Sequence, residues 1–574
     1  MSKTKLIIIV LLISAIAGGY WYTQQTSTSG SPSGSTKSTL LSRVPADTVV
    51  FMGGSETIPF VNPYDNESMK DLQLSIDDQF DQLAQLTEGK DSPAATVLMN
   101  LYKDLANHFY SGQMTEINDF AIYSLGVYPV AAWKASDIDS FTNKLNAIEN
   151  DNNIATRTFT LGNAELREYL IDDSAPVKMY IAINEDIVSV SAMSNNPSMQ
   201  KLLAGVDLPK QSLANTDKLQ DLASNHQLLP FAMGYIDVNL AITSLSNSDD
   251  NLLKSTLHEA SEGEDMPDFT SEVCFTDAAK IIAKWPRMIF GYRTFDIDSN
   301  PIIMDAAMIF EHTNSEFLSA IKGTLGSLPE YSMENDMLSM GFGINIDNIA
   351  TFLTDFRKDI MSETYQCESL IEMQQKIAQN DPAMIAMGAQ MVAGVQGVSV
   401  HVTHIDATAF SSGDMTKFEG MVVITANNPN NLILAAGNFY PPLAQMALES
   451  NAEAQPLILP MGITAHVSMS DNALILQFGQ AEEVSSRIAD IHQGKGLSSS
   501  LIRSGMDLSA YFKMIEPMMT NALTQAAATS QDTEEIKKMV KLFETLNIKF
   551  VYDVNVEDAG IAIKVKTSMN NASN

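Results

Sequence analysis

Residues able to do chemistry are scattered along this 574-residue chain, and their spacings complete no known catalytic motif. Ser198 and Ser319 each stand three residues before a lysine, as the nucleophile of penicillin-recognising enzymes does, but the Lys-Thr-Gly element of those enzymes is missing. A Gly-x-Ser-x-Gly nucleophile turn does not occur, and His258 lacks a second histidine at the zinc-protease spacing. The sequence therefore identifies no catalytic residue.

Metal-binding spacings are also incomplete. His401 and His404 are the closest histidine pair, but they lie in a strand-like run, where residues three apart point to opposite faces. Two Asp-Ile-Asp tripeptides, 137–139 and 296–298, do not continue into the twelve-residue loop that binds calcium. We therefore expect neither a metal site nor a bound cofactor.

Charge and composition exclude several classes of partner. Acidic residues outnumber basic ones 69 to 35, which gives a formal net charge of −34. Nucleic acids and anionic lipid headgroups are bound chiefly by Lys and Arg, so we expect neither as a partner. With 45% hydrophobic and 18% charged residues, the chain is expected to fold into globular domains.

Methionine is abundant, with 32 residues, and it gathers near Met337 and Met340 and near Met518 and Met519. Because the methionine side chain is flexible, it fills irregular gaps in a core. The same property suits a groove for a lipid or for an unfolded protein, and the sequence leaves both interpretations open.

An uncharged apolar stretch occupies residues 6–22, after Lys3 and Lys5 and before a Ser/Thr/Gly-rich linker at 23–39. By the positive-inside rule the amino terminus stays cytoplasmic and the bulk of the chain is exported to the periplasm. The stretch reaches the length of a single inner-membrane anchor, with residues 1–22 as a signal-anchor, and the flexible linker favours that role.

A cleaved signal peptide is the alternative, because residues 15–17 read Ala-Ile-Ala and fit a cleavage site. The other long uncharged stretch, 383–400, is interrupted by Gln390 and Gln396 and is expected to be buried in a soluble domain.

Residues 195–209 and 427–441 carry Asn, Asn, Pro, Gly and Pro at identical offsets. In each segment an Asn is expected to cap a short helix, a Pro to begin it and a Gly to end it. These structural caps are Asn196, Pro197 and Gly205 in the first segment and Asn428, Pro429 and Gly437 in the second.

The pattern recurs more loosely at 313–323, and each copy follows an apolar, strand-like run, at 187–192, 302–310 and 421–425. The repeated unit is therefore a strand, a tight cap and a short helix.

A second recurring pattern is a strand that leads into an aspartate before an amphipathic helix, as at Asp237, Asp347 and Asp507. Aspartate is a favoured N-cap, and its charge suits the amino end of a helix, so capping explains the pattern better than catalysis.

The chain contains only two cysteines, Cys274 and Cys367, and each opens a helical stretch in a comparable position. Export to an oxidising compartment and these matching positions favour a disulfide between them. Closing a loop of that length would contribute up to about 4–5 kcal/mol of stability. Burial as two ordinary apolar thiols is the alternative.

The fold class is expected to be α+β, with antiparallel sheets and short capped helices in internally repeated units. Residues 548–567 alternate apolar and polar side chains around a Glu-Asp-Ala-Gly turn and predict a terminal hairpin. The predicted α+β regions are 40–250, 270–360 and 365–574, the last of which includes the hairpin.

These features favour a non-enzymatic protein of the bacterial cell envelope, anchored in the inner membrane, that binds or scaffolds a protein or lipid partner. An exported hydrolase whose catalytic carboxylates are scattered along the chain is the alternative, because such a pair has no recognisable sequence spacing.

If residues 6–22 are an anchor, the mature protein should begin at or near Met1 and should sediment with membranes. Amino-terminal sequencing that finds Gly18 first would establish the cleaved signal peptide instead. The part after residue 39 should stay soluble without detergent, because its net charge is far from zero.

If Cys274 and Cys367 are paired, alkylation of the unreduced, denatured protein should label neither cysteine, and reduction should lower the melting temperature. Labelling of both cysteines before reduction would show two buried thiols.

Overall fold

A computed structural model describes most of the chain after the linker. The described residues are 40–54, 58–59, 92–110, 116–117, 119–171, 177–230, 232–246, 251–260, 272–296, 299–329, 336–379, 392–406, 417–437, 440–446, 448–459, 463–479, 482–493, 496–525, 537, 540–541 and 543–570. Within these ranges no helix is both long and apolar enough to span a bilayer. The predicted anchor at 6–22 and linker at 23–39 lie outside the described residues.

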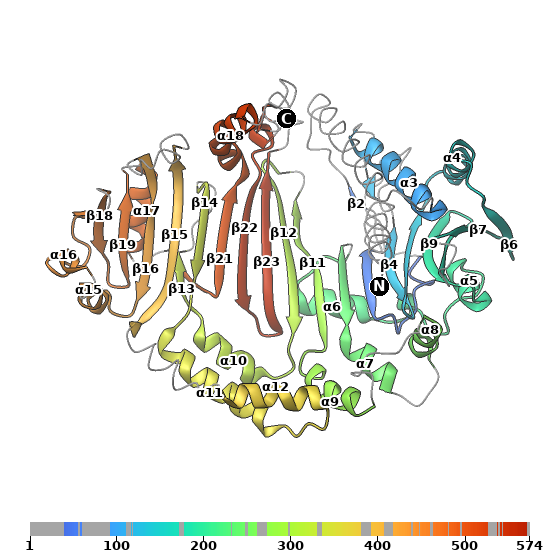
Figure 1. Ribbon diagram of the computed structural model, residues 1–574, viewed down its shortest axis with the longest axis horizontal. Coiled ribbons are helices and arrows are strands. Elements are labelled where there is room, and N and C mark those ends of the chain that lie inside the picture. The colour runs from blue at the N-terminus through green and yellow to red at the C-terminus, as the bar shows by residue number, and fades with distance from the viewer. Residues whose placement is uncertain are drawn as a thin grey trace. The chain divides into compact units, whose positions relative to one another are not determined.

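The chain divides into two compact units, which are described separately (Figure 1). Unit 1 comprises Met1–Ile297 with Ala572–Asn574, and unit 2 comprises Asp298–Asn571. The predicted regions 40–250, 270–360 and 365–574 divide the chain differently and stay a prediction.

Unit 1 contains an antiparallel sheet whose strands lie in the order β11–β10–β1–β4–β5–β9–β8–β7–β6. A separate two-stranded pair joins β2 to β3. The strands are β1 (Val50–Gly54), β2 (Ile58–Pro59), β3 (Glu116–Ile117), β4 (Phe120–Leu125), β5 (Tyr128–Lys134), β6 (Arg157–Leu161), β7 (Ala164–Leu170), β8 (Val177–Asn184), β9 (Ile187–Ser194), β10 (Met233–Asp237) and β11 (Arg287–Asp296).

Helices α3 and α4 cover one face of this sheet. Their apolar residues join Phe120, Trp133 and Val188 in one buried cluster, and the rings of Trp133 and Phe141 meet edge to face at 5.9 Å. The helices of unit 1 are α3 (Pro93–Tyr110), α4 (Ile138–Asp151), α5 (Pro197–Leu203), η1 (Leu213–Asn215), α6 (Lys218–His226), α7 (Val238–Ser246), α8 (Leu252–Ala260) and α9 (Glu272–Ile282).

The main sheet of unit 2 is also antiparallel, in the order β12–β23–β22–β21–β14–β15–β16–β19–β18–β17. A second, two-stranded sheet pairs β13 with β20. The strands are β12 (Ile302–Glu311), β13 (Gly326–Pro329), β14 (Leu338–Phe342), β15 (Val395–Ile405), β16 (Phe418–Ala426), β17 (Gln455–Ile458), β18 (Thr464–Met469), β19 (Ala473–Phe478), β20 (Leu497–Ser500), β21 (Ile502–Asp507), β22 (Lys549–Val556) and β23 (Gly560–Met569).

The helices of unit 2 pack on different sides of its sheet. Helix α17 buries Val484 and Ile488 against Val423 and Ile475, whereas Ile433 of α15 and Leu443 of α16 pack with Leu474, which points to the other side. The helices are α10 (Ser315–Thr324), α11 (Ile346–Ser362), α12 (Glu368–Gln379), α15 (Pro429–Gly437), α16 (Pro441–Ala444), α17 (Glu482–His492) and α18 (Leu508–Gln525).

Strand β13 lies directly on β14 and β15, on the same side of the sheet as α17. A side chain at Gly341 would meet the Leu328 methyl carbons at 3.2 and 3.3 Å, and one at Gly397 would meet the Ser327 carbonyl oxygen at 2.7 Å. Glycine at both positions therefore permits the close approach of the two layers.

The α+β class with antiparallel sheets is confirmed, and β22 and β23 form the hairpin that the alternation predicts. Several helices are longer than expected, notably α3, α11 and α18. Helix α18 continues through Pro517, which a sequence reading treats as a helix-breaking residue.

The expectation that residues 383–400 form one buried segment is wrong for its described part. Residues 395–405 form β15, and Val398 and Val400 are 41% and 40% exposed. Alternate side chains of a strand point to opposite faces, so an uncharged run does not imply burial on both.

Candidate functional site

One side of the main sheet in unit 2 exposes large apolar side chains on neighbouring strands. On β14, Met340 and Phe342 are 48% and 46% exposed, and on β15 they lie opposite Val400 and Val398. We call this side the apolar face. Its exposed residues are Met308, Phe310, Leu338, Met340, Phe342, Val398, Val400 and Tyr552.

The strand register extends the apolar face across the sheet. Met340 pairs with Ser504 on β21, Ser504 pairs with Tyr552 on β22, and Tyr552 pairs with Val565 on β23. Directly paired residues point to the same side of a sheet, so each row continues from strand to strand. The remaining positions in register from β12 to β15 are uncharged: Ile302, Met304, Ala306, Val402, Ile502, Ser504, Met506, Phe550, Val554, Val556, Ile561, Ile563, Val565, Thr567 and Met569. Four of them are buried, namely Ile302, Val402, Val554 and Val556.

The opposite side of the same strands carries the charges. Asp305 lies across from Lys566, and Asp553 lies across from Lys564, so opposite charges are adjacent. Arg503 donates to the Pro329 carbonyl at 3.2 Å and to Ser498 Oγ at 2.8 Å, which connects the sheet to β13 and β20. Strands β13 and β20 therefore lie on the charged side of the sheet, beside β21.

Such a patch is unusual for an isolated soluble protein. Single exposed apolar residues are common, but contiguous apolar surfaces rimmed by polar residues mark sites of interaction. The apolar face is contiguous through the strand register, and the chain that carries it has a net charge of −34. It is therefore the leading candidate for a binding surface.

A buried polar network lies on the charged side, between the sheet and α17. His401 Nδ1 is 2.9 Å from Asp336 Oδ2, and His401 Nε2 is 3.0 Å from Ser399 Oγ. Arg487 of α17 donates to the second oxygen of Asp336. The exposed fractions of these four residues range from 0% to 7%.

The network has the connectivity of a serine-hydrolase triad. An imidazole that donates from Nδ1 to the carboxylate leaves Nε2 to accept the Ser399 proton. However, Ser399 is only 3% exposed and lies between Gly397, which β13 covers, and His401. A substrate carbonyl cannot reach Oγ there. We therefore assign a structural role to the network: it holds α17, and the segment just before β14 that contains Asp336, against β15.

Sequence reasoning missed this network. Ser399 and His401 are two residues apart on one strand and therefore share a face, which is a usable signal. Asp336 and Arg487 are distant in sequence, and only the tertiary fold brings them to the histidine.

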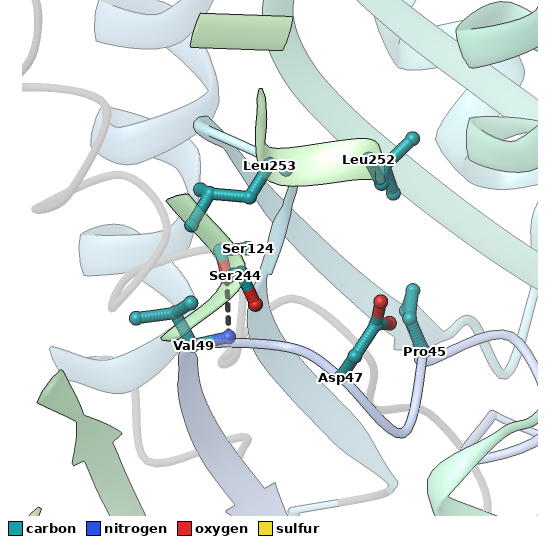
Figure 2. A pocket seen from close by; sticks show the side chains of 8 residues that line it. Pro45, Asp47, Val49, Ser124, Ser244, Leu252 and Leu253 are labelled. Carbon is teal, nitrogen blue, oxygen red and sulfur yellow. Dashed lines mark hydrogen bonds between the residues drawn. The ribbon is translucent and has the colours of Figure 1, made fainter. Parts of the chain in front are cut away.

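A small pocket lies in unit 1, beside the start of β1 (Figure 2). Leu252 and Leu253 of α8 face Val49 and Ser124 across it, and the space suffices for about one water molecule. The Ser124 hydroxyl already accepts from the Val49 amide at 3.0 Å, so this polar wall serves the fold. The pocket is lined by Pro45, Asp47, Val49, Ser124, Gly126, Ser244, Leu252 and Leu253.

The predicted cap residues lie at helix ends in both segments. Asn196 accepts from the amides of Ser198 and Met199, α5 begins at Pro197, and Gly205 has a φ of 65° just beyond the helix. Asn428 accepts from the Asn430 amide at 3.1 Å, and α15 runs from Pro429 to Gly437. In the third segment, Asn314 caps α10.

Two of the recurring aspartates cap helices and also pair with lysines. Asp237 accepts from the Leu240 amide at 2.9 Å and lies 3.2 Å from Lys218 Nζ. Asp507 accepts from the Ala510 amide at 3.0 Å, and Lys549 Nζ is 3.6 Å away. Asp347 instead lies in the first turn of α11 and accepts from the Gly394 amide at 2.9 Å.

The other sequence candidates are dispersed. His401 is buried, whereas His404 is exposed, and a β-bulge separates their strand positions. Ser198 lies in the first turn of α5 and Ser319 in α10. Cys274 lies in α9 of unit 1 and Cys367 directly precedes α12 of unit 2, and their pairing stays a prediction. Within the described ranges, no three His, Cys, Asp or Glu side chains form a group that could hold a metal.

Comparison with models of known protein families finds no match, and comparisons with curated proteins and with solved structures find none either. The case for function therefore depends on the geometry of this chain.

Replacing Asp336 with Asn should destabilise the strands around β15, because it removes the buried carboxylate that pairs with Arg487 and His401. Breaking such a pair costs about 3–5 kcal/mol. Amide hydrogen exchange should show protection in β14 and β15 falling at least 100-fold. Lys322→Gln, which removes a pair to the exposed Asp558, should leave protection nearly unchanged and serves as the control. Full protection in Asp336→Asn would contradict the structural role.

Proposed function

We propose that this protein is a non-enzymatic binding or scaffolding protein whose apolar face holds an apolar partner, either a protein segment or lipid acyl chains. The observation that carries the proposal is the uncharged side of the unit 2 sheet from β12 to β15, on which eight large apolar side chains are exposed. An uncharged surface contributes binding energy through burial of apolar area and imposes no desolvation cost on a charge.

The energetics require a partner that covers a broad area of the apolar face. Complete burial of a side chain such as Val, Met or Phe contributes about 1.5–3 kcal/mol, and these residues retain 36–48% of their exposure. The eight exposed residues together therefore offer several kcal/mol. That amount is comparable to the low end of the roughly 4–15 kcal/mol cost of association, so the partner must also cover the half-buried residues in register.

The sequence supports an extracytoplasmic location. Residues 6–22 are proposed to anchor the chain in the inner membrane, and the linker at 23–39 would let the folded part reach a partner in the periplasm. The net charge of −34 opposes adsorption of the apolar face to an anionic lipid surface. A protein partner or a neutral lipid is therefore favoured.

We also propose that the two units are copies of one α+β unit. Strand β1 of unit 1 and strand β14 of unit 2 have matching neighbours. On one side of each lies a strand that ends in a capping aspartate, β10 in unit 1 and β21 in unit 2. On the other side lies the first strand of a hairpin, β4–β5 in unit 1 and β15–β16 in unit 2. The pairs β5–β9 and β8–β9 have counterparts in β16–β19 and β18–β19. The matching roles of Asp237 and Asp507 support the same correspondence.

The hydrolase alternative has one specific observation in its favour, the connectivity of Ser399, His401 and Asp336. The burial of Ser399 counts against it, and we rank it second.

The proposal predicts that the apolar face binds an apolar probe. Bis-ANS fluorescence with the full chain should be enhanced, and the double variant Met340→Glu/Val400→Glu should lose at least half of that enhancement. Both side chains are exposed and directly paired, so the two carboxylates place charge at the centre of the face without entering the core.

Leu208→Glu is the matched control, because Leu208 is 58% exposed but lies on a loop of unit 1, outside the apolar face. It should leave the fluorescence unchanged, and both proteins should keep their melting temperatures within a few degrees. Equal fluorescence from the double variant and the control would contradict the proposed surface.

A further inference from the structure

We infer that two copies of the chain associate through β6, the last strand of the unit 1 sheet, which pairs antiparallel with β6 of the second copy. The two sheets would then continue into each other across a twofold axis. The surface belongs to unit 1, whereas the apolar face belongs to unit 2, so this inference does not rest on the proposed function.

Strand β6 lies at the end of its sheet (Figure 1). It pairs with β7, from Arg157 opposite Glu168 to Leu161 opposite Ala164. Among the described elements, β7 is the only one that packs along its length. The other edge of β6 is therefore open to a further strand.

The residues that direct their backbone groups to this open edge are Thr158 and Thr160. A two-residue turn joins Leu161 to Ala164, so Leu161 and Ala164 form the hydrogen-bonded pair next to the turn. Inward and outward backbone groups alternate along an edge strand, which places the amides and carbonyls of both threonines outside. No hydrogen bond between described residues reaches these groups. Such an unpaired row is a template for another strand.

The last strand of the unit 2 sheet, β17, has an edge that is blocked. The Leu459 amide donates to the Ile463 carbonyl at 2.8 Å, so Pro456 and Ile458 direct their backbone groups outward. Pro456 has no N–H to donate, and the Ile458 carbonyl accepts from the Tyr440 hydroxyl. Strand β6 has neither a proline nor such a covering side chain, although proteins commonly protect their edge strands.

The sequence of β6 is complementary to itself. In an antiparallel pair centred on Phe159, Thr158 of one chain lies opposite Thr160 of the other, and these outward residues exchange hydrogen bonds in both directions. Phe159 lies opposite its own counterpart in a non-hydrogen-bonded pair, where side chains are closest. Arg157 lies opposite Leu161, so no like charges are adjacent. A twofold contact requires this kind of self-complementarity, and we therefore favour a second copy over a different protein.

The local charge of the edge also permits the contact. Residues 154–161 contain no acidic side chain, although the chain has a net charge of −34. Arg157 lies 5.2 Å from the centre of the Phe159 ring and 3.6 Å from Glu168, so its charge is partly balanced within one chain. Repulsion between more distant acidic groups of the two copies is screened beyond about 8–10 Å.

Photocrosslinking of the full chain in intact cells tests the pairing, because the proposed anchors would hold both copies in one membrane and raise their effective concentration. A benzophenone amino acid replaces Phe159, and the products are mapped by mass spectrometry. We expect a species of twice the chain mass with adducts on residues 157–161 of the second copy. The control places the probe at Leu434, which is 66% exposed on α15 of unit 2, and should give at least tenfold less dimer.

A pair of variants at one position tests the hydrogen bonds. Thr160→Pro removes an outward amide and leaves the β6–β7 ladder intact, because proline is tolerated at such positions of edge strands. Thr160→Val keeps the amide and the branched side chain and is the matched control. The yield of dimer crosslinked from position 159 should fall at least tenfold with proline and stay within twofold with valine. Melting temperatures within a few degrees of each other would show that both variants are folded.

The other outcomes overturn the inference. Adducts on a different protein, or on another part of the same chain, would show that something else pairs with β6. Equal dimer yields from the proline and valine variants would overturn the strand pairing, and absence of a crosslinked dimer would overturn the association. The proposed function is unaffected by these results, because its own test is the bis-ANS fluorescence.

Discussion

The alternation of side chains along antiparallel strands is the constraint on which unit 2 depends. Because successive residues point to opposite sides, each strand from β12 to β15 can give one side to charges and the other to apolar groups. Asp305, Arg503 and Asp553 fall on one side, and Met340, Phe342 and Val400 fall on the other. A shift of one residue in the pairing of β12 with β23 would place Asp305 in the apolar face and Met304 among the ion pairs. The register therefore maintains both the stability of the covered side and the chemistry of the open side.

The side of the sheet that carries the charges also buries apolar residues, such as Ile309 and Ala562. Several of its buried charges have partners. Asp336 binds both His401 and Arg487, and Arg503 binds Asp553 and the β13–β20 layer. Glycines at 341 and 397 let that layer approach closely enough to exclude water. Burying the polar side leaves the apolar side available, and this is the physical origin of the proposed binding surface.

The two units solve the same problem in different ways. In unit 1 the hairpin β4–β5 lies under α3 and α4, and Trp133 and Phe120 are almost fully buried. In unit 2 the corresponding hairpin lies under α15 and α16 at one end only, and Val398 and Val400 stay exposed. The first hairpin is therefore more deeply buried than the second, although Met52 of the neighbouring strand β1 is 40% exposed.

The sequence by itself determined the local elements. Apolar runs and their end signals identified β9, β12 and β16, the helix starts at Asn196 and Asn428, the terminal hairpin and the α+β class, because caps, turns and periodicity act over a few residues. The same signals could not predict which strands lie next to one another in a sheet. The two Asn-Pro segments follow β9 and β16, and these strands occupy different positions in the proposed correspondence of the units. Only the tertiary structure decided that Asp336 and Arg487 meet His401, and that Val398 and Val400 face water. Strand register and layer packing join residues far apart in the chain, and no local pattern encodes which face of a sheet will be covered.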